Sequence, residues 1–417
     1  MGYLIIGNSA AGMFAAEAIR KYDRQGEIVI LSTEKENIYS RCLTTYYVSG
    51  QIEKSGLFIR PDNHYAAQNI DFRGDTRVTG IWVAEKLVEL ADGAKLGYDK
   101  LLIASGANAV RETIEGARPE EIQVMRTLAD ADKIMTRLEG GPKRVVVLGG
   151  GLVSLKTAGA LAEHGVSITI IVTSPYILSQ QFDKRGADLI MNRLADNGVH
   201  FIIGSSAAEL LHDSAGACSG LKLDTGEIIA CDLVFMGKGV TPNSEFIPPE
   251  IDMAGKLIKT DKYMRTSAAD IYAAGDVALS YDRVSGQPAV YAIWPNATAQ
   301  GTVAGANMAG GQIEYGGAVS MNSLHFFGLN AICGGDSRGK EEGSVEEYVY
   351  NPTRSSYQKC VFVEGRLTGF ILVGRIANAG VLMARLGDQL SFEQCLDILG
   401  RGIVASALPD LGGIAYV

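Results

Sequence analysis

The amino-acid sequence predicts an α/β fold with two parallel-sheet domains and an α+β domain at the C-terminal end. Two stretches with one shared pattern, beginning at Tyr3 and Val145, carry this prediction. Each reads as a strand, a glycine-rich turn, a helix and a second strand, which together make a βαβ unit. A third observation is the alternation of apolar and polar residues after Gly316, which indicates antiparallel strands.

The first stretch reads YLIIGNSAAG over residues 3–12, with a helical pattern to about Tyr22 and an apolar run at 28–31. Glycines after a strand let the backbone turn tightly and approach a pyrophosphate, which then lies at the positive end of the following helix. The stretch therefore predicts a dinucleotide cradle. Its members are Gly7, Ser9, Ala10, Ala11 and Gly12.

The second stretch reads VVVLGGG over residues 145–151, followed by a helical pattern to about His164 and an apolar run at 166–172. The same argument predicts a second cradle, formed by Gly149, Gly150, Gly151, Leu152 and Val153. One such turn is weak evidence, because ordinary strand-to-helix turns also contain glycine. Two in one chain indicate two Rossmann-like domains.

The segment after Gly316 differs from both stretches. The runs 357–363 and 368–373 alternate in polarity and are separated by the short turn 364–366, which predicts an antiparallel hairpin. The end of the chain reads as helical and then irregular. We therefore expect a third domain of α+β type.

Composition narrows the class of protein. A chain of 417 residues is long enough for two or three domains, and a formal charge of −9 offers no basic surface for nucleic acid or an anionic membrane. No apolar run reaches the roughly 18 residues of a membrane-spanning helix, and the start lacks a signal-peptide pattern, so we expect a cytoplasmic protein. The six cysteines form no CxxC or CxxxxC pair, which argues against a metal site and against a local redox disulfide.

Three further motifs lie between and after the cradles. They read LLIASGA at 101–107, GKGVTPN at 237–243 and IYAAGD at 271–276. In this order and spacing, with the two glycine turns, the chain resembles over nearly its whole length the two-dinucleotide flavoprotein family related to glutathione reductase. The resemblance implies an enzyme with FAD in the first cradle and NAD(P)H in the second, and two Rossmann-like domains of the three-layer ββα type.

The resemblance also implies domain bounds and ligand-binding residues. The expected domains are a discontinuous FAD-binding domain at 1–109 and 241–315, an NAD(P)H-binding domain at 110–240, and a C-terminal interface domain at 316–417. Further FAD contacts are expected at Glu34, Arg41, Val78, Ala104, Ser105, Gly106, Asp276, Ala297 and Gln300. Further NAD contacts are expected at Thr173, Gly237 and Lys238.

Two of these acids have alternative interpretations. Asp276 resembles the family aspartate that accepts hydrogen bonds in the ribityl or pyrophosphate region of FAD, or it caps a following helix. Glu34 is a candidate for the adenosine ribose hydroxyls. Ser32 is the alternative residue for that role, and Glu34 is then a solvated loop acid.

The details favour one branch of the family. The chain lacks both the CxxxxC pair and the C-terminal His-Pro of glutathione-reductase-like members, so disulfide reduction by a dithiol is not expected. The segment 37–47, NIYSRCLTTYY, is similar to rubredoxin and ferredoxin reductases and nitrite reductase flavin modules, as is 322–329. The resemblance implies electron transfer from NADH to a rubredoxin- or ferredoxin-type carrier, or to an iron–sulfur subunit of a larger metalloenzyme such as an aldehyde oxidoreductase.

Cys42 and Lys156 leave mechanistic alternatives open. Cys42 falls where NADH oxidases, peroxidases and coenzyme A disulfide reductases carry a single redox cysteine, and Arg41 would favour its thiolate; otherwise Cys42 is an inert packed residue. Lys156 stands where relatives often carry a glutamate, so it either approaches the flavin or nicotinamide or is a surface lysine. Ser154 replaces the usual third glycine and is expected to set helix and strand slightly further apart.

The choice of coenzyme and partner remains open as well. The apolar run ends at Thr173 and Ser174, without the acid typical of NADH-selecting relatives and without an arginine for a 2′-phosphate, and NADH is favoured over NADPH. A homodimer or a place in a heteromeric complex is expected, with no bound metal. A third hypothesis is a FAD-bearing assembly subunit whose nicotinamide site has decayed.

Overall fold

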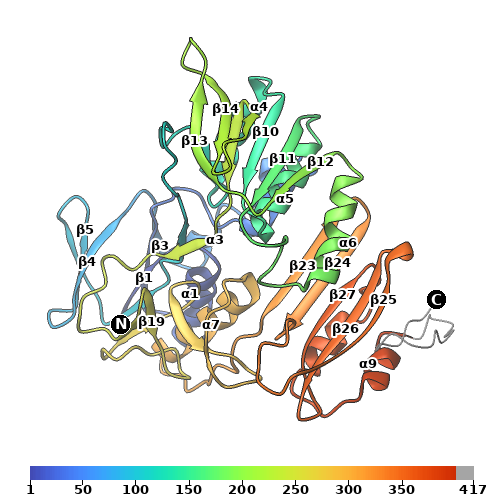
Figure 1. Ribbon diagram of the computed structural model, residues 1–417. Helices are drawn as coiled ribbons and strands as arrows, with labels where there is room; N and C mark the ends of the chain where they lie inside the picture. The colour runs from blue at the N-terminus through green and yellow to red at the C-terminus, as the bar shows by residue number, and fades with distance from the viewer. Residues whose placement is uncertain (401–417) are drawn as a thin grey trace. The chain divides into compact units, whose positions relative to one another are not determined.

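The computed structural model describes residues 1–400 and confirms the predicted α/β class (Figure 1). Contacts divide the chain into two compact units. The first unit comprises Met1–Leu43, Glu53–Asn108 and Val240–Val319, and the second comprises Thr44–Ile52, Ala109–Gly239 and the chain from Ser320 onward. The three domains expected from the sequence stay a prediction, and the part of the third at 401–417 lies outside the described residues.

A parallel five-stranded sheet forms the centre of the first unit. Its strands, in sheet order, are β20 (Ile271–Ala273), β7 (Lys100–Ile103), β1 (Gly2–Ile6), β2 (Glu27–Leu31) and β3 (Ile70–Arg73). The inner strands are almost continuously apolar because both faces of a parallel sheet are covered. The carboxyl ends of all five strands therefore meet at one edge, where ligands bind in such sheets.

Helices α1 (Ala10–Tyr22) and α7 (Trp294–Met308) pack against each other in this unit (Figure 1). The two helices approach closely because Gly301 of α7, which has no side chain, faces the backbone of α1. A Cβ on Gly301 would lie 2.1 Å from the carbonyl oxygen of Ala11. The helix interface therefore depends on residues without side chains.

Smaller elements complete the first unit. The antiparallel layer of the ββα arrangement is β4 (Val78–Trp82), β5 (Leu87–Leu90) and β6 (Lys95–Gly97). A four-stranded sheet contains β18 (Met253–Ala254), β19 (Leu257–Lys259), β21 (Ala278–Tyr281) and β22 (Pro288–Ala289). Short helices are η1 (Arg41–Leu43), η2 (Lys54–Leu57) and α3 (His64–Ala67), and β8 (Ala107–Ala109) and β17 (Val240–Pro242) stand where the chain passes between units.

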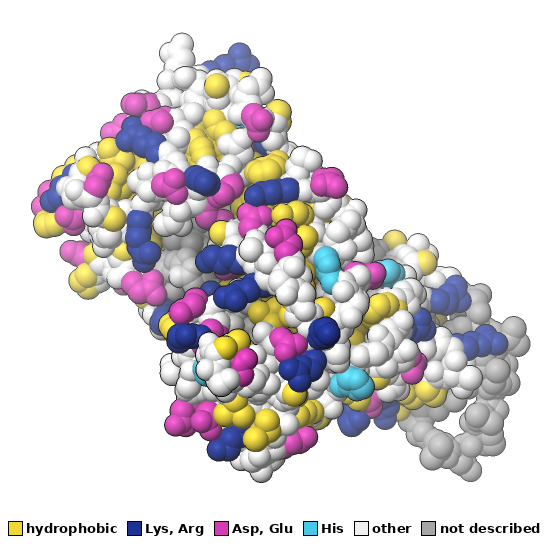
Figure 2. All heavy atoms as spheres, turned by 90° about the horizontal axis from the view of Figure 1, so that it is seen from above, with side chains coloured by type: hydrophobic (Ala, Val, Ile, Leu, Met, Phe, Trp, Pro, Cys, Tyr) yellow, Lys and Arg dark blue, Asp and Glu magenta, His cyan; other side chains and the backbone are white. Residues whose placement is uncertain are grey.

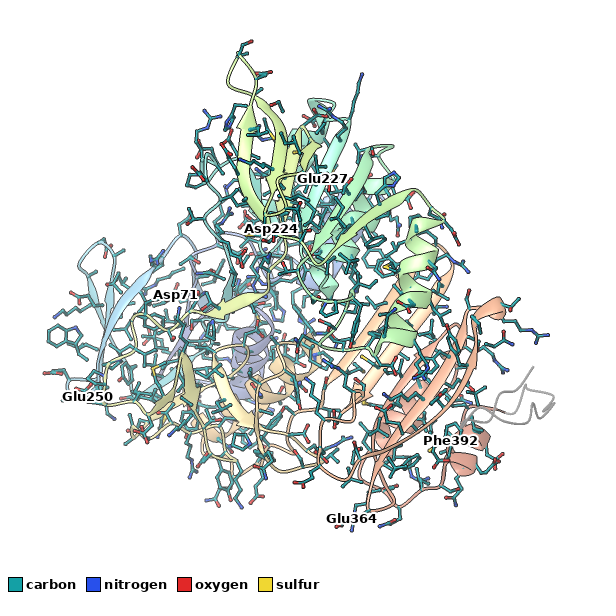
Figure 3. All side chains as sticks on the ribbon, in the orientation of Figure 1. Asp71, Asp224, Glu227, Glu250, Glu364 and Phe392 are labelled. Carbon is teal, nitrogen blue, oxygen red and sulfur yellow. The ribbon has the colours of Figure 1, made fainter. Side chains whose placement is uncertain are left out.

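The second unit repeats the arrangement. Its parallel sheet has the order β12 (Val199–Ile203), β11 (Ser167–Val172), β10 (Arg144–Leu148), β16 (Leu233–Met236) and β9 (Ile122–Gln123). The associated helices are α2 (Thr44–Val48), α4 (Leu128–Glu139), α5 (Leu152–Ala162) and α6 (Lys184–Ala195). The antiparallel layer is β13 (Ala207–His212), β14 (Cys218–Leu223) and β15 (Ile228–Ala230), and Figure 3 labels Asp224 and Glu227 in the turn between its last two strands.

A five-stranded antiparallel sheet follows in the same unit and confirms the predicted hairpin. Its order is β23 (Met321–Phe326), β24 (Leu329–Gly335), β27 (Arg366–Val373), β26 (Ser356–Val363) and β25 (Val345–Asn351), with η3 (Pro352–Arg354), α8 (Ala379–Ala384) and α9 (Phe392–Ile398) beside it. Glu364 and Gly365 both have positive φ, as a two-residue hairpin turn requires. The strands β26 and β27 are buried almost throughout, and α6 packs against both.

Among residues 1–400, no helix is both long and apolar enough to cross a membrane. On the face drawn in Figure 2, acidic and basic side chains are interspersed.

Candidate functional site

The first cradle lies at the carboxyl edge of the sheet in the first unit, where β1 and β7 are neighbours. Gly7 follows β1 with a φ of +117°, and a Cβ there would lie 2.1 Å from the carbonyl oxygen of Ala104. A Cβ on Gly12, in the first turn of α1, would lie 1.8 Å from the carbonyl oxygen of Gly7. The strand, turn and helix therefore come this close only with glycine at both positions.

The amino end of α1 presents backbone donors to an anion. Ser9 is the N-cap residue but makes no side-chain capping bond, and the first turn contains no acid. The hydrogen bonds along the helix begin with the backbone N–H of Met13, which donates to the carbonyl of Ser9. The amides of Ala10, Ala11 and Gly12 thus stand at the positive end of the helix, as a pyrophosphate cradle requires.

Arg41 brings a cation to the same helix end. Its Nε atom donates to the Ser9 hydroxyl at 3.3 Å, while its guanidinium pairs with Glu34 and donates to the Tyr39 hydroxyl at 3.0 Å. Burial opposes the charge, but neighbouring Tyr39 and Glu34 outweigh it and raise the pKa of Arg41. The residues present therefore fit the negatively charged pyrophosphate of FAD.

Glu34 and Ser32 have different local functions. The Ser32 hydroxyl accepts the backbone N–H of Glu34 at 3.1 Å and so shapes the turn after β2. The Glu34 carboxylate accepts the Tyr39 hydroxyl at 2.6 Å and holds Arg41. Binding of the FAD ribose by Glu34 stays a prediction.

The turn at Asp276 is fixed against α7. The Gln300 side-chain oxygen accepts the backbone N–H of Gly275 at 2.7 Å, and Ala297 lies one turn earlier on the same helix. Asp276 is followed by a turn and β21, so the alternative that it caps a following helix is wrong. Asp276 follows the carboxyl end of β20, and its neighbour Gly275 lies against the first cradle, since a Cβ on Gly275 would lie 3.2 Å from the Cβ of Ala11.

A pair of loops closes this edge through Ser105 and Asn243. The Ser105 hydroxyl donates to the Asn243 carbonyl at 2.7 Å, and the Asn243 amide group donates to the Ser105 carbonyl at 3.0 Å. The backbone N–H of Asn243 also donates to the carbonyl of Gly106 at 2.9 Å. Asn243 was not among the predicted site residues, although it ends the motif GKGVTPN.

Asn243 and Val78 differ in what they offer a ligand. Within residues 1–400, the buried side-chain oxygen of Asn243 has no hydrogen-bond partner, so it can accept a hydrogen bond from a bound ligand. Val78 opens β4 with its side chain in the core of the unit. Its predicted contact with FAD therefore rests on its backbone.

The second cradle repeats the first in the other unit. Gly149 follows β10 with a φ of +111°, and a Cβ there would lie 2.5 Å from the carbonyl oxygen of Gly237, which follows β16. Gly151 is the N-cap of α5, and neither a capping side chain nor an acid occupies the first turn, which includes Leu152 and Val153. This helix end also fits a pyrophosphate.

The departure from the usual glycine pattern has a structural use. Ser154 is fully buried, and its hydroxyl donates to the Gly237 carbonyl at 3.0 Å. The hydroxyl thus joins the start of α5 to the end of β16. A third glycine would leave this carbonyl without that hydrogen bond.

Lys238 spans the carboxyl edge of the second sheet. Its ammonium nitrogen lies 3.2 Å from the Glu112 carboxylate and 3.4 Å from the Thr173 hydroxyl. Thr173 follows β11, whereas Lys238 follows β16, and β10 lies between these strands. The lysine therefore reaches across the strand that ends in the second cradle. Glu112 was not predicted, because no local motif marks it.

Lys156 lines a cavity of about 170 Å³ within the second unit. Its walls include Tyr46, Glu163, His325, Phe326 and Phe327. The cavity combines aromatic rings with groups of both charges, and the role of Lys156 stays a prediction. Cys42 is exposed in η1 of the first unit, next to Arg41.

Two positive helix ends, each at the carboxyl edge of its own parallel sheet, define a protein that binds two dinucleotides. Residues 1–301 match the family described as pyridine nucleotide-disulphide oxidoreductase. The chain belongs to this family, whose members use FAD and NAD(P)H, and it is an NAD(P)H-dependent flavin oxidoreductase.

The relatives include proteins that serve redox partners or larger assemblies. The chain is 34% identical over 383 residues to the NADH-dependent phenylglyoxylate dehydrogenase subunit epsilon of Aromatoleum evansii, covering 91% of this chain and 90% of that protein. It is 30% identical to a rubredoxin-NAD(+) reductase of Pseudomonas putida, covering 74% and 80%. The NAD-dependent persulfide reductase of A. fulgidus superposes with a TM-score of 0.87 at 26% identity, covering 95% of this chain and 79% of that chain.

Proposed function

We propose that this chain takes a hydride from NADH and passes the electrons to a protein partner, as the flavin subunit of a multi-subunit dehydrogenase or as the reductase of a small carrier. One observation carries the proposal: a single chain contains two helices, α1 and α5, that each begin without a capping side chain after a tight glycine turn at the edge of a parallel sheet. Such a chain is built to hold two dinucleotides at once.

The similarity to named proteins supports the choice of partner. The phenylglyoxylate dehydrogenase subunit matches along nine-tenths of its own length, so the likeness extends beyond the cradles to the antiparallel sheet of the second unit. By its name, that protein is one subunit of an NADH-dependent dehydrogenase. We therefore favour an iron–sulfur subunit as the partner, with rubredoxin- or ferredoxin-type carriers as the second candidates.

The chain's own residues are suited to binding rather than to acid–base catalysis. FAD, when bound, accepts a hydride and releases electrons one at a time. In the first unit, Arg41 and the amides of α1 offset the pyrophosphate charge, while Asp276 offers an acceptor to hydroxyl groups. In the second unit, the amides of α5 and Lys238 serve the nicotinamide dinucleotide.

A thiol-dependent reaction at Cys42 is the alternative. The exposure of Cys42 favours it, as does the fold shared with a persulfide reductase. Under the electron-transfer proposal, Cys42→Ser retains nearly full reduction of a one-electron dye by NADH. A loss of peroxide or disulfide turnover of more than about tenfold, equivalent to about 1.4 kcal/mol of barrier, with dye reduction kept, would favour the alternative.

An anaerobic titration with NADH tests the proposal directly. The protein loaded with FAD is expected to lose its flavin absorbance stoichiometrically and to recover it on addition of an oxidised rubredoxin, ferredoxin or iron–sulfur subunit. A flavin that NADH leaves unchanged would contradict the proposal and support a subunit with a decayed nicotinamide site. A flavin bleached by NADH but reoxidised only by disulfides or peroxide would point to Cys42.

The position of Lys238 predicts its effect on coenzyme binding. Lys238→Met is expected to weaken the binding of NADH by about tenfold or more, because one charge-assisted bond of about 1.5–3 kcal/mol is lost. The loss is expected to be larger for NADPH, since the ammonium lies beside Thr173, at the strand end that carries the ribose acid in NADH-selecting relatives.

Fluorescence titration of the two coenzymes measures these affinities. Lys222→Met is the matched control, because Lys222 pairs with Glu209 at 3.2 Å on the antiparallel layer of the same unit. Equal affinities for wild type and Lys238→Met would show that the lysine binds neither coenzyme.

A further inference from the structure

We propose that Cys218 and Cys231 form a dithiol that hydrogen peroxide closes reversibly into a disulfide. The two residues are 13 apart in sequence, and their sulfur atoms lie 3.8 Å apart. Neither belongs to the cradles or to the cavity at Lys156. The site therefore adds a redox modification to the protein, independent of hydride transfer.

Strand pairing holds the two cysteines together. Gly220 of β14 pairs with Ala230 of β15, and the backbone N–H of Cys231 donates to the carbonyl of Ser219 at 3.3 Å. The thiol of Cys218 also contacts the carbonyl oxygen of Cys231 at 3.4 Å. A disulfide needs an S–S distance of about 2.05 Å, so the sulfurs must approach by less than about 2 Å.

The surroundings assign different roles to the two thiols. Cys218 is half-buried and open to a small oxidant, whereas Cys231 is fully buried in the apolar core beneath it. The contact with Cys231 lowers the pKa of Cys218, while the same contact and burial raise the pKa of Cys231. Cys218 is thus the thiol that peroxide oxidises first, and Cys231 is the resolving thiol.

The reaction balances with hydrogen peroxide as the only oxidant. The Cys218 thiolate attacks one peroxide oxygen, the O–O bond breaks, and a sulfenic acid and hydroxide form, the hydroxide taking up the thiol proton as water. The Cys231 sulfur then attacks the sulfenic sulfur, and the hydroxyl group leaves with the Cys231 proton as a second water. Two thiols lose two electrons and peroxide gains them.

The disulfide would connect two parts of the second unit. Asp232, next to Cys231, accepts the backbone N–H groups of Lys143 and Arg144 at 3.0 and 2.9 Å and pairs with the Arg144 guanidinium at 2.6 Å. These contacts anchor the chain at the start of β10, just before it enters β16. The disulfide ties β14 to that anchor, so oxidation is expected to stabilise the unit.

The remaining cysteines provide internal comparisons. Cys360 and Cys395 also contact each other, but both are fully buried in the second unit. Cys333 is buried as well, and Cys42 is exposed. Peroxide is therefore expected to reach Cys42 and Cys218 first. Of these two, Cys218 has the thiol of Cys231 at 3.8 Å as a partner for a disulfide.

The test uses the full chain in the Cys42→Ser background, treated with peroxide, alkylated under denaturing conditions and digested. We expect a mass decrease of about 2 Da in the protein weighed before alkylation, and the loss of two alkylatable thiols. The digest should contain a linked pair of peptides with Cys218 and Cys231 that dithiothreitol separates. The oxidised protein should melt about 5 °C higher than the reduced protein.

The variant Cys218→Ser should show neither the linked peptides nor the change in melting temperature, and Cys360→Ser should retain both. A sulfinic acid on Cys218 beside a reduced Cys231, or no oxidation at peroxide concentrations that oxidise Cys42 in the parent chain, would overturn the proposal. Because thiols are counted without any coenzyme, the outcome is independent of the proposed electron transfer.

Discussion

The variant Gly12→Ala is expected to lose FAD. Its new methyl group would lie 1.8 Å from the carbonyl oxygen of Gly7, a backbone atom that cannot move without opening the first cradle. Overpacking of this kind costs about 1–3 kcal/mol, and each 1.4 kcal/mol lowers affinity about tenfold. We expect the affinity for FAD to fall by about tenfold to a hundredfold.

The ratio of flavin to protein after reconstitution measures this loss. Gly2→Ala is the matched control, because its Cβ would lie at ordinary contact distances, 3.8 Å from the Asp99 carboxylate and 4.0 Å from the Asp99 backbone nitrogen. Gly2 also lies in β1, the strand that leads to the same turn. Circular dichroism distinguishes a folded apoprotein from a misfolded one. Full flavin occupancy in Gly12→Ala would place FAD elsewhere in the molecule.

The variant Lys359→Met is expected to destabilise the protein strongly. The Lys359 side chain is fully buried in β26, with its nitrogen 2.7 Å from the Glu346 carboxylate and 3.1 Å from that of Asp183. Asp183 also accepts the Tyr357 hydroxyl at 2.5 Å and caps α6 through the backbone N–H of Gly186. Methionine fills the same space but leaves two carboxylates without a cation.

Removing one partner of a buried ion pair costs about 3–5 kcal/mol, and the partial exposure of the two acids places our expectation near the lower value. The melting temperature should fall by about 10 °C. Lys184→Met is the control, because Lys184 pairs with Asp188 on the exposed face of α6, where such pairs contribute about 0.5 kcal/mol. Equal melting temperatures for both variants would contradict a structural role for Lys359.

The cradles were predictable from the sequence because their parts are local. Gly7 and Gly149 each follow a short apolar strand and precede a helix, so their spacing alone indicates a tight turn beside a positive helix end. The hairpin of β26 and β27 was predictable for the same reason, since alternating polarity and a short turn fall within one stretch.

Contacts across long sequence separations were not predictable. Lys238 faces both Thr173 and Glu112, and the spacing of these residues carries no pattern. Cys218 and Cys231 lacked any recognised spacing, so the scattered cysteines argued against a disulfide, yet the pairing of β14 and β15 brings them together. The alternation of apolar and polar residues around Lys359 did not indicate that this lysine is fully buried, because α6, which covers that face of the sheet, comes from a distant part of the chain.

The sequence by itself determined the α/β class, the two glycine cradles and the family. The reason is that the periodicity of apolar residues and the spacing of glycines are local patterns, visible within a few neighbouring residues. Only the tertiary structure decided that Arg41 is held by Glu34 beside α1, that Ser154 binds the end of β16, and that the thiols of Cys218 and Cys231 meet. These contacts depend on how the strands are ordered and paired, and residues far apart in sequence carry no local signal of that order.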